Sequence, residues 1–495
     1  MATQKRPPVI VVMGHIDHGK STLLDTIRKT NIVDTEAGGI TQHLSAYTVS
    51  HTSQEHGVRS LTFLDTPGHA SFQKMRLRGA DVADIAVLIV SAEDAVMPQT
   101  LEALAAIKEA KIPYIVAINK IDKPNADLVR TQSSLIENEI FIEGMGGDIP
   151  WVAISAKQGT GIDELLDTLI LTAELNEVEG DPDAPAVGTV IEGGLDKKRG
   201  IAATIIVKNG SIKAGSFVVA EHALAPVRIM ENTFGKQVKE AGLSEPVEII
   251  GWSEIPRAGA EFVVVKTKKE AEALVFDFKE TKIRNAPVTR YKMQTIPLIP
   301  VVIKADTLGS IEAITTEIDK LKNDRVDIKI VSATIGDISV TDIQNANATS
   351  HAIVVGFHNK IDRPATELAE RLNVATKSFE IIYDLADWMK TMIDDRLPRK
   401  EEEVESGKIK ILKHFSAQKN VHVMGGKVLE GTMSVKQRVH IMRRDIKLGN
   451  GVVENLQQSK SNVERVTEGE FGMQIATKVD VSEGDVLVPF TIVVS

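Results

Sequence analysis

Residues 14–21 read Gly14-His15-Ile16-Asp17-His18-Gly19-Lys20-Ser21, between a short apolar stretch, Pro8–Met13, and a helical pattern, Thr22–Lys29. Glycines in this pattern let backbone N–H groups approach phosphate oxygens, and the helix N-terminus adds positive charge. Lys20 is placed to reach the outer phosphates, and the Ser21 hydroxyl to bind Mg²⁺. A glycine turn that fits by chance is the weaker interpretation. The sequence therefore predicts a phosphate-binding loop.

A second motif, Asp65-Thr66-Pro67-Gly68, follows the strand predicted for Leu61–Leu64. An aspartate at a strand end can hold Mg²⁺ through water, and the following glycine can donate its N–H to a γ-phosphate. By itself the tetrapeptide also favours an ordinary turn. Its weight comes from its place after a strand.

Two more motifs indicate which nucleotide base is bound. Asn119-Lys120-Ile121-Asp122 follows the predicted strand Tyr114–Ile118, and Ser155-Ala156-Lys157 follows Trp151–Ile154. A carboxylate can accept both N–H groups on the edge of guanine, which adenine does not offer, and a backbone N–H can reach the guanine O6. Four motifs in this order, each after a strand, predict binding of GTP or GDP with Mg²⁺.

The predicted fold is a multidomain α/β protein. Strands alternate with helices over residues 1–176, which predicts a doubly wound parallel sheet, a P-loop domain that binds a nucleotide. Short β-rich runs over 185–282 predict a β-barrel. We expect an α/β/α domain over 293–383, a linker helix over 384–406 and a C-terminal β-barrel over 407–495.

Composition narrows the class of protein. The 495 residues include no cysteine, which excludes a disulfide scaffold, a cysteine-ligated metal and a thiol nucleophile. The dozen histidines show no convincing metal-ligand spacing, and no apolar run reaches the ~18 residues of a membrane span. We expect a cytoplasmic protein. The net charge is −10, yet Gly407–Arg465 holds twelve Lys or Arg against four Asp or Glu, which indicates either an RNA contact or a solvated face.

The first two motifs resemble those of translational GTPases. Glu36-Ala37-Gly38-Gly39-Ile40-Thr41-Gln42-His43 resembles, more narrowly, switch I of the bacterial translation initiation factor 2 family, and Asp65–Phe72 fits the same family. The resemblance spans residues 8–490. It implies a fold with a GTPase domain, a barrel, an α/β/α domain and a C-terminal barrel.

The resemblance also implies roles for single residues. Thr41 would join Ser21 and Asp65 at Mg²⁺, and His69 would orient the attacking water. Ile16 and Ile40 would form an apolar gate, and Asp17 would organise the phosphate environment. His15 and His18 are expected to shape the loop and not to catalyse. The expected nucleotide contacts are Gly14, His15, Ile16, Asp17, His18, Gly19, Lys20, Ser21, Thr22, Asp65, Thr66, Pro67, Gly68, His69, Asn119, Lys120, Ile121, Asp122, Ser155, Ala156 and Lys157.

The implied function is translation initiation. The C-terminal barrel would bind formyl-methionyl initiator tRNA through Phe471, Arg438, Arg443 and Arg444, with Phe471 standing where the family has cysteine. The chain, a monomer, would act with other initiation factors on the small ribosomal subunit, promote joining of the large subunit and leave after ribosome-stimulated GTP hydrolysis. The alternatives are an elongation or recycling GTPase, or a non-ribosomal GTP-dependent assembly chaperone.

Overall fold

The structure is a computed structural model that falls into two units, Met1–Arg396 and Leu397–Ser495. No helix in the described part of the chain is long and apolar enough to cross a membrane. The residues described are 3–28, 41–53, 57–196, 198–284, 298–322, 326–348, 352–396, 401–418, 420–444, 446–459 and 461–494.

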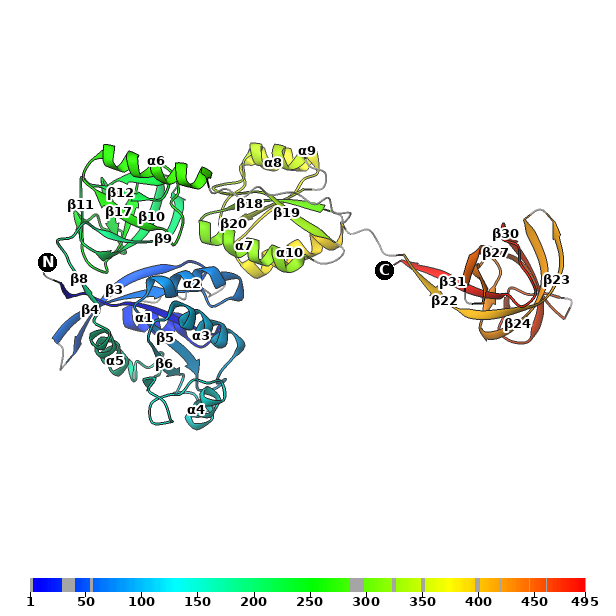
Figure 1. The fold of residues 1–495 in the computed structure, drawn as a ribbon, viewed down its shortest axis with the longest axis horizontal. Coiled ribbons are helices and arrows are strands. Elements are labelled where there is room, and N and C mark those ends of the chain that lie inside the picture. The colour runs from blue at the N-terminus through cyan, green and yellow to red at the C-terminus, as the bar shows by residue number, and fades with distance from the viewer. Residues whose placement is uncertain are drawn as a thin grey trace. The chain divides into compact units, whose positions relative to one another are not determined.

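The first domain is built on a six-stranded sheet in the order β3-β4-β2-β5-β6-β7 (Figure 1). Alternate residues of β2 enter different cores, Val9 and Val11 on one face and Ile10 and Val12 on the other, because helices cover both faces. The strands are β2 Val9–Gly14, β3 Ser45–Ser53, β4 Gly57–Asp65, β5 Ile85–Ser91, β6 Tyr114–Asn119 and β7 Trp151–Ala153. The helices are α1 Lys20–Arg28, η3 Ala70–Phe72, α2 Gln73–Val82, α3 Pro98–Ala110, α4 Leu128–Glu137 and α5 Ile162–Leu175.

The expectation of a wholly parallel sheet is wrong at one edge. Strand β3 runs antiparallel to β4, with Ser45 opposite Asp65 and Ser53 opposite Gly57. The connection between them is too short for the crossover that a parallel pair needs, so the two strands form a hairpin. The other pairs are parallel, which brings the carboxyl ends of β2, β4 and β6 to one edge of the sheet.

The second domain is an antiparallel β structure with one core. Its main sheet has the order β13-β12-β17-β9-β10-β16-β14, and β11 pairs with β15. The helix α6 Lys268–Arg284, which the β-rich pattern did not predict, follows the last strand. The strands are β9 Val187–Asp196, β10 Gly200–Asn209, β11 Ile212–Lys213, β12 Phe217–Ala220, β13 Ala223–Pro226, β14 Ile229–Asn232, β15 Glu240–Ala241, β16 Pro246–Ile250 and β17 Glu261–Val265. Upstream, β8 Glu179–Gly180 pairs with β1 Gln4–Lys5.

The third domain is a parallel four-stranded sheet, β19-β18-β20-β21. Figure 1 shows α8 and α9 on one side of this sheet and α7 and α10 on the other. The strands are β18 Leu298–Ala305, β19 Asp327–Ile335, β20 Ile353–Phe357 and β21 Ala375–Phe379. The helices are α7 Leu308–Leu321, α8 Val340–Asn347, α9 Arg363–Leu372 and α10 Ile382–Asp394.

The linker helix expected over 384–406 is wrong in its second half. Helix α10 buries Leu385, Met389 and Ile393 and so belongs to the third domain. Residues 397–400 lie outside the described residues, and Glu401–Glu405 forms strand β22 of the second unit. This acidic run is a strand because it pairs antiparallel with the last strand of the chain.

The second unit is a closed barrel, as predicted. Strand β31 pairs with both β23 and β26, which closes the order β31-β23-β24-β30-β27-β26 into a ring. Its core includes Ile409, Ile441 and Leu487. The strands are β22 Glu401–Glu405, β23 Gly407–Gln418, β24 Val421–Gly431, β25 Met433–Ser434, β26 Arg438–Arg443, β27 Ile446–Gln458, β28 Ser461–Asn462, β29 Arg465–Val466, β30 Glu470–Thr477 and β31 Val486–Val494.

Candidate active site

The loop after β2 packs so closely that two of its positions require glycine. Gly14 has φ +151°, and a Cβ there would lie 2.4 Å from the carbonyl oxygen of Ile89. Gly19 has φ +89°, and its Cβ would lie 2.4 Å from the Asn119 side-chain nitrogen. Side chains rarely adopt such backbone conformations. The two glycines thus let the loop lie directly against β5 and β6.

Lys20 begins α1 and is held over this loop. Its Nζ donates to the carbonyl of Gly14 at 3.0 Å and to that of His15 at 2.6 Å. Burial lowers the pKa of Lys20 to about 8, and the negative charge of Asp65 opposes this shift. Gly68 lies so near that a Cβ on it would be 2.6 Å from Nζ. The Lys20 amine is therefore a largely buried cation that lies between the phosphate-binding loop and Gly68 of the second motif.

Three oxygen-bearing side chains predicted to share a metal ion lie together. The Ser21 Oγ is 3.0 Å from the Thr41 Oγ1, and Thr41 donates to the Asp65 Oδ2 at 3.4 Å. Two hydroxyls and a carboxylate are the hard oxygen ligands that Mg²⁺ prefers, and Mg²⁺ sites in proteins commonly use few protein ligands and keep several waters. The residues present therefore fit this ion. Ile40, expected to gate the site, lies outside the described residues.

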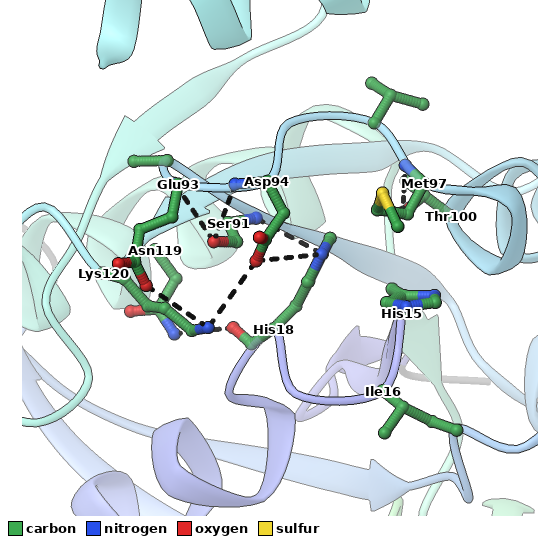
Figure 2. Close-up of polar contacts among 12 residues, drawn as sticks. His15, Ile16, His18, Ser91, Glu93, Asp94, Met97, Thr100, Asn119 and Lys120 are labelled. Atoms are coloured by element: carbon green, nitrogen blue, oxygen red, sulfur yellow. Dashed lines mark hydrogen bonds and ion pairs between the residues drawn. The ribbon is translucent and has the colours of Figure 1, made fainter. Parts of the chain in front are cut away.

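The third and fourth motifs are connected to the loop by hydrogen bonds. The Asn119 Nδ2 donates to the His18 carbonyl at 2.9 Å, and its Oδ1 accepts from the Ala156 N–H at 2.9 Å. Figure 2 shows Asn119 reaching His18 in this way. The Ser155 hydroxyl donates to Asp122 at 2.7 Å, which lowers the pKa of that carboxyl. Asp122 is thus an oriented carboxylate beside the loop.

His18 supports the loop from inside. Its buried ring accepts a hydrogen bond from the Ser91 N–H at 3.3 Å and faces Asp94 (Figure 2). Burial lowers the pKa of His18 to about 4, so the ring is neutral near pH 7. Burial also lowers the pKa of His15. His18 thus connects the loop to the end of β5, and a role for either histidine in shaping the loop stays a prediction.

His69 faces the third domain. Its Nδ1 lies 2.5 Å from the Ser71 Oγ and caps η3 by accepting from the Ser71 N–H. Its ring meets Tyr383 of α10 edge-on, with centroids 4.4 Å apart, and Ser71 donates to Glu317 of α7. Burial lowers the pKa of His69. Within the described residues, its hydrogen bonds and ring contacts do not include residues 14–21. The predicted catalytic side chain is thus held by contacts with Ser71 and Tyr383.

Arg76, which no sequence motif singles out, holds the second motif. Its buried guanidinium donates to the carbonyls of Pro67 at 3.4 Å, Gly68 at 3.3 Å and His69, and it pairs with Glu102 at 2.8 Å. The only signal in the sequence was a basic residue in a helix that must pack against the sheet. Arg76 fixes the backbone on which Gly68 and His69 depend.

The C-terminal barrel corrects part of the expected tRNA contact. Phe471 is only 5% exposed and packs in the barrel core, so it does not face a ligand. Strand alternation explains this, since Phe471, Met473 and Ile475 share the inner face. Arg443 forms a two-bond ion pair with Asp485 at 2.8 and 2.9 Å. Arg438 and Arg444 are exposed.

Comparison with known proteins covers all three domains of the first unit. Residues 5–174 match the family described as Elongation factor Tu GTP binding domain. Residues 185–265 match the family Elongation factor G domain 2, and residues 278–390 match the family Translation-initiation factor 2. The chain is 41% identical over 501 residues to translation initiation factor IF-2 of Carboxydothermus hydrogenoformans, covering 99% of this chain and 60% of that protein.

A second relative extends this likeness. The chain is 39% identical over 502 residues to translation initiation factor IF-2 of Clostridium novyi, covering 99% of this chain and 72% of that protein. The crystal structure of GDP-bound aIF5B from Aeropyrum pernix is 26% identical, covers 98% of this chain and 92% of that chain, and gives a TM-score of 0.49. The chain spans 51% of the IF-2 of Pelotomaculum thermopropionicum, so it corresponds to about half the length of some relatives.

Proposed function

Because the chain belongs to the translation initiation factor IF-2 family, we propose that it is a GTP-hydrolysing factor of translation initiation. The observation that carries this proposal is the convergence of Ser21, Thr41 and Asp65 beside the phosphate loop. The contacts of Thr41 connect the segment that begins at Thr41 to Ser21 of the first motif and Asp65 of the second motif. Such a segment can respond to the phosphate at the end of a nucleotide.

The nucleotide site follows from the side chains described. Lys20 would exchange its two carbonyl acceptors for phosphate oxygens, and Asp122 would accept from the guanine edge. Ser21, Thr41 and Asp65 would hold Mg²⁺, which when bound neutralises charge on the phosphates. Asn119 would keep the base-binding loop in register with the phosphate loop through His18 and Ala156.

Hydrolysis requires His69 to leave its contacts with Ser71 and Tyr383. A neutral imidazole can then accept a hydrogen bond from the attacking water and orient it. We propose that contact with the ribosome supplies this rearrangement, so that hydrolysis is slow in the free protein and fast on the ribosome.

The remaining partners follow from the family and the barrel. We propose that the chain, with other initiation factors, places formyl-methionyl initiator tRNA on the small subunit and promotes joining of the large subunit. Exposed Arg438 and Arg444, with Lys436 and Lys447, would contact tRNA phosphates. Phe471 supports the barrel fold and is no longer proposed as a tRNA contact.

The decisive experiment is GTP hydrolysis by the full chain with and without ribosomes. We expect strong stimulation by ribosomes and its loss in Ser21→Ala. The control is Thr168→Ala, whose hydroxyl donates to a carbonyl of its own helix. Binding of formyl-methionyl-tRNA and of unformylated methionyl-tRNA to the same chain is compared in parallel. Ribosome-stimulated hydrolysis by a chain that binds both tRNAs equally would indicate an elongation or recycling factor. Hydrolysis that ribosomes leave unchanged would support the assembly chaperone.

A further inference from the structure

Two histidines and one aspartate from distant parts of the chain meet beside the segment that carries Thr41. His43 lies two residues after Thr41, Asp306 follows β18 at the start of α7, and His358 follows β20. The His43 Nε2 is 3.4 Å from the Asp306 Oδ2, and the His358 Nδ1 is 3.3 Å from the same oxygen. One ligand atom from each residue lies within 4.8 Å of the others.

Neighbouring groups orient two of these side chains. The His358 Nε2 lies 2.8 Å from the backbone carbonyl of Glu380, which can only accept, so this nitrogen carries a hydrogen. In the neutral ring the Nδ1 then presents a lone pair on the side of the ring that faces the Asp306 Oδ2. The Asp306 Oδ1 accepts from the Thr307 N–H at 2.8 Å and the Ser310 hydroxyl at 2.7 Å. These bonds turn Oδ2 toward both rings.

Two of the three separations between the ligand atoms match a coordination shell, and the third is at most 4.8 Å. For metal–ligand bonds of 2.0–2.2 Å, the corners of a tetrahedron lie about 3.3–3.6 Å apart. Both measured separations to the Asp306 Oδ2 fall in this range. A hydrogen bond from a histidine to one carboxylate oxygen is usually shorter, near 2.7–2.9 Å. Two imidazole nitrogens and one carboxylate suit Zn²⁺ and related ions better than Mg²⁺.

We propose that His43, Asp306 and His358 form a binding site for Zn²⁺ or a similar divalent transition metal, with water as the fourth ligand. The His43 side chain is 42% exposed, which gives the ion a path from solvent. The Glu380 carbonyl and the two donors to Asp306 supply the outer contacts that metal-binding side chains commonly make.

The site would tie the segment after residue 40 to the third domain. That segment already contacts the domain there, since the Gln42 Nε2 donates to the Glu380 carbonyl at 2.9 Å. Thr41, at the proposed Mg²⁺ position, is two residues away. If the proposed function holds, nucleotide and transition-metal binding are coupled through this segment. The metal site itself does not rest on that function.

The test is a Zn²⁺ titration of the full, untagged chain after treatment with a chelator, without nucleotide, in competition with a chromophoric chelator. We expect one bound equivalent. Removing one ligand by His43→Ala, His358→Ala or Asp306→Asn should weaken binding on the order of 100-fold or more, beyond the usual effect of losing an outer contact. Asp306→Asn keeps a carbonyl oxygen for its two donors.

The matched control is His51→Ala. His51 also contacts an aspartate, with its Nε2 3.0 Å from the Asp167 Oδ1, but it does not belong to the histidine–carboxylate cluster described above. It should bind Zn²⁺ like the unaltered chain. Circular dichroism checks folding, and because the His43 side chain is partly exposed, the His43→Ala variant should keep its fold. Absence of tight binding to the unaltered chain, or equal binding by all variants, would overturn the proposal and leave the three residues as an ion pair.

Discussion

Glu192 should make the stability of the folded chain depend on pH. It lies where the first, second and third domains contact one another. This side chain lies on β9 of the second domain, and its Oε1 accepts from the Gly309 N–H of α7 at 3.1 Å. Arg78 of α2 is close by and pairs with Glu312 of α7 at 2.7 Å. Burial raises the pKa of Glu192 to about 7, although the Gly309 hydrogen bond and the charge of Arg78 act in the opposite direction.

The sign follows from proton binding. The folded chain binds the Glu192 proton more tightly than the unfolded chain, whose glutamate has its ordinary pKa of 4.5. The contribution of Glu192 to stability is therefore highest below about pH 4.5, falls as the pH rises toward 7, and levels off above it. A rise of roughly 2.5 pKa units corresponds to about 3 kcal/mol. That is the upper size of the effect at pH 8.

The perturbation is Glu192→Gln, which keeps an oxygen to accept from Gly309 and cannot ionise. The variant should be more stable than the unaltered chain by less than about 1 kcal/mol at pH 5 and by up to about 3 kcal/mol at pH 8. The assay is urea unfolding of the full chain at both pH values, with Glu261→Gln, an exposed residue of the same domain, as control. An equal stability difference at the two pH values would refute the raised pKa. Destabilisation at both would show that Glu192 acts as the anion partner of Arg78.

Three further predictions concern the nucleotide site and the barrel. Asp122→Asn should weaken GTP and favour xanthosine triphosphate, because an amide can donate to the altered base; competition binding measures this, and unchanged preference would contradict the guanine contact. His69→Ala should keep GTP affinity and lose about 10²-fold in ribosome-stimulated hydrolysis, measured as phosphate release; a normal rate would exclude His69. Phe471→Ala should destabilise the barrel by about 3–5 kcal/mol in thermal unfolding, because it opens a core cavity; a barrel of unchanged stability would show that Phe471 is not a core residue.

The strands of the first sheet could be predicted because they are buried on both faces and read as continuous apolar runs. Ile85–Ser91 is buried throughout. Strand β3 could not, because Ser45–Ser53 is an edge strand rich in polar residues. Helix α6 was missed because the charged pattern of Lys268–Arg284 follows a β-rich run without a strong apolar period. Glu401–Glu405 is a strand only because the last strand pairs with it.

In the candidate site, too, some contacts could be predicted from the sequence and others depend on tertiary packing. Ser21 and Asp65 could be placed together because parallel strands bring their motifs to one edge. The contacts of His69 with Tyr383, and of Arg76 with the second motif, depend on how domains and helices pack. Phe471 was misassigned because a motif position does not reveal which face of a strand points into a barrel.

The second motif and the segment after residue 40 share one neighbour, the third domain. Gln42 donates to the Glu380 carbonyl, and His69 packs on Tyr383. An edge-on ring contact is worth about 0.5–1.5 kcal/mol, and the hydrogen bond to Ser71 about 1 kcal/mol. If His69 orients the attacking water as proposed, breaking both contacts would cost roughly 2 kcal/mol and slow hydrolysis about 30-fold before any partner binds. Because Tyr383 of α10 provides one of these two contacts, a partner that shifts α10 relative to the first domain would weaken the restraint on His69. Under the proposed mechanism, the rate of hydrolysis would then report on that shift.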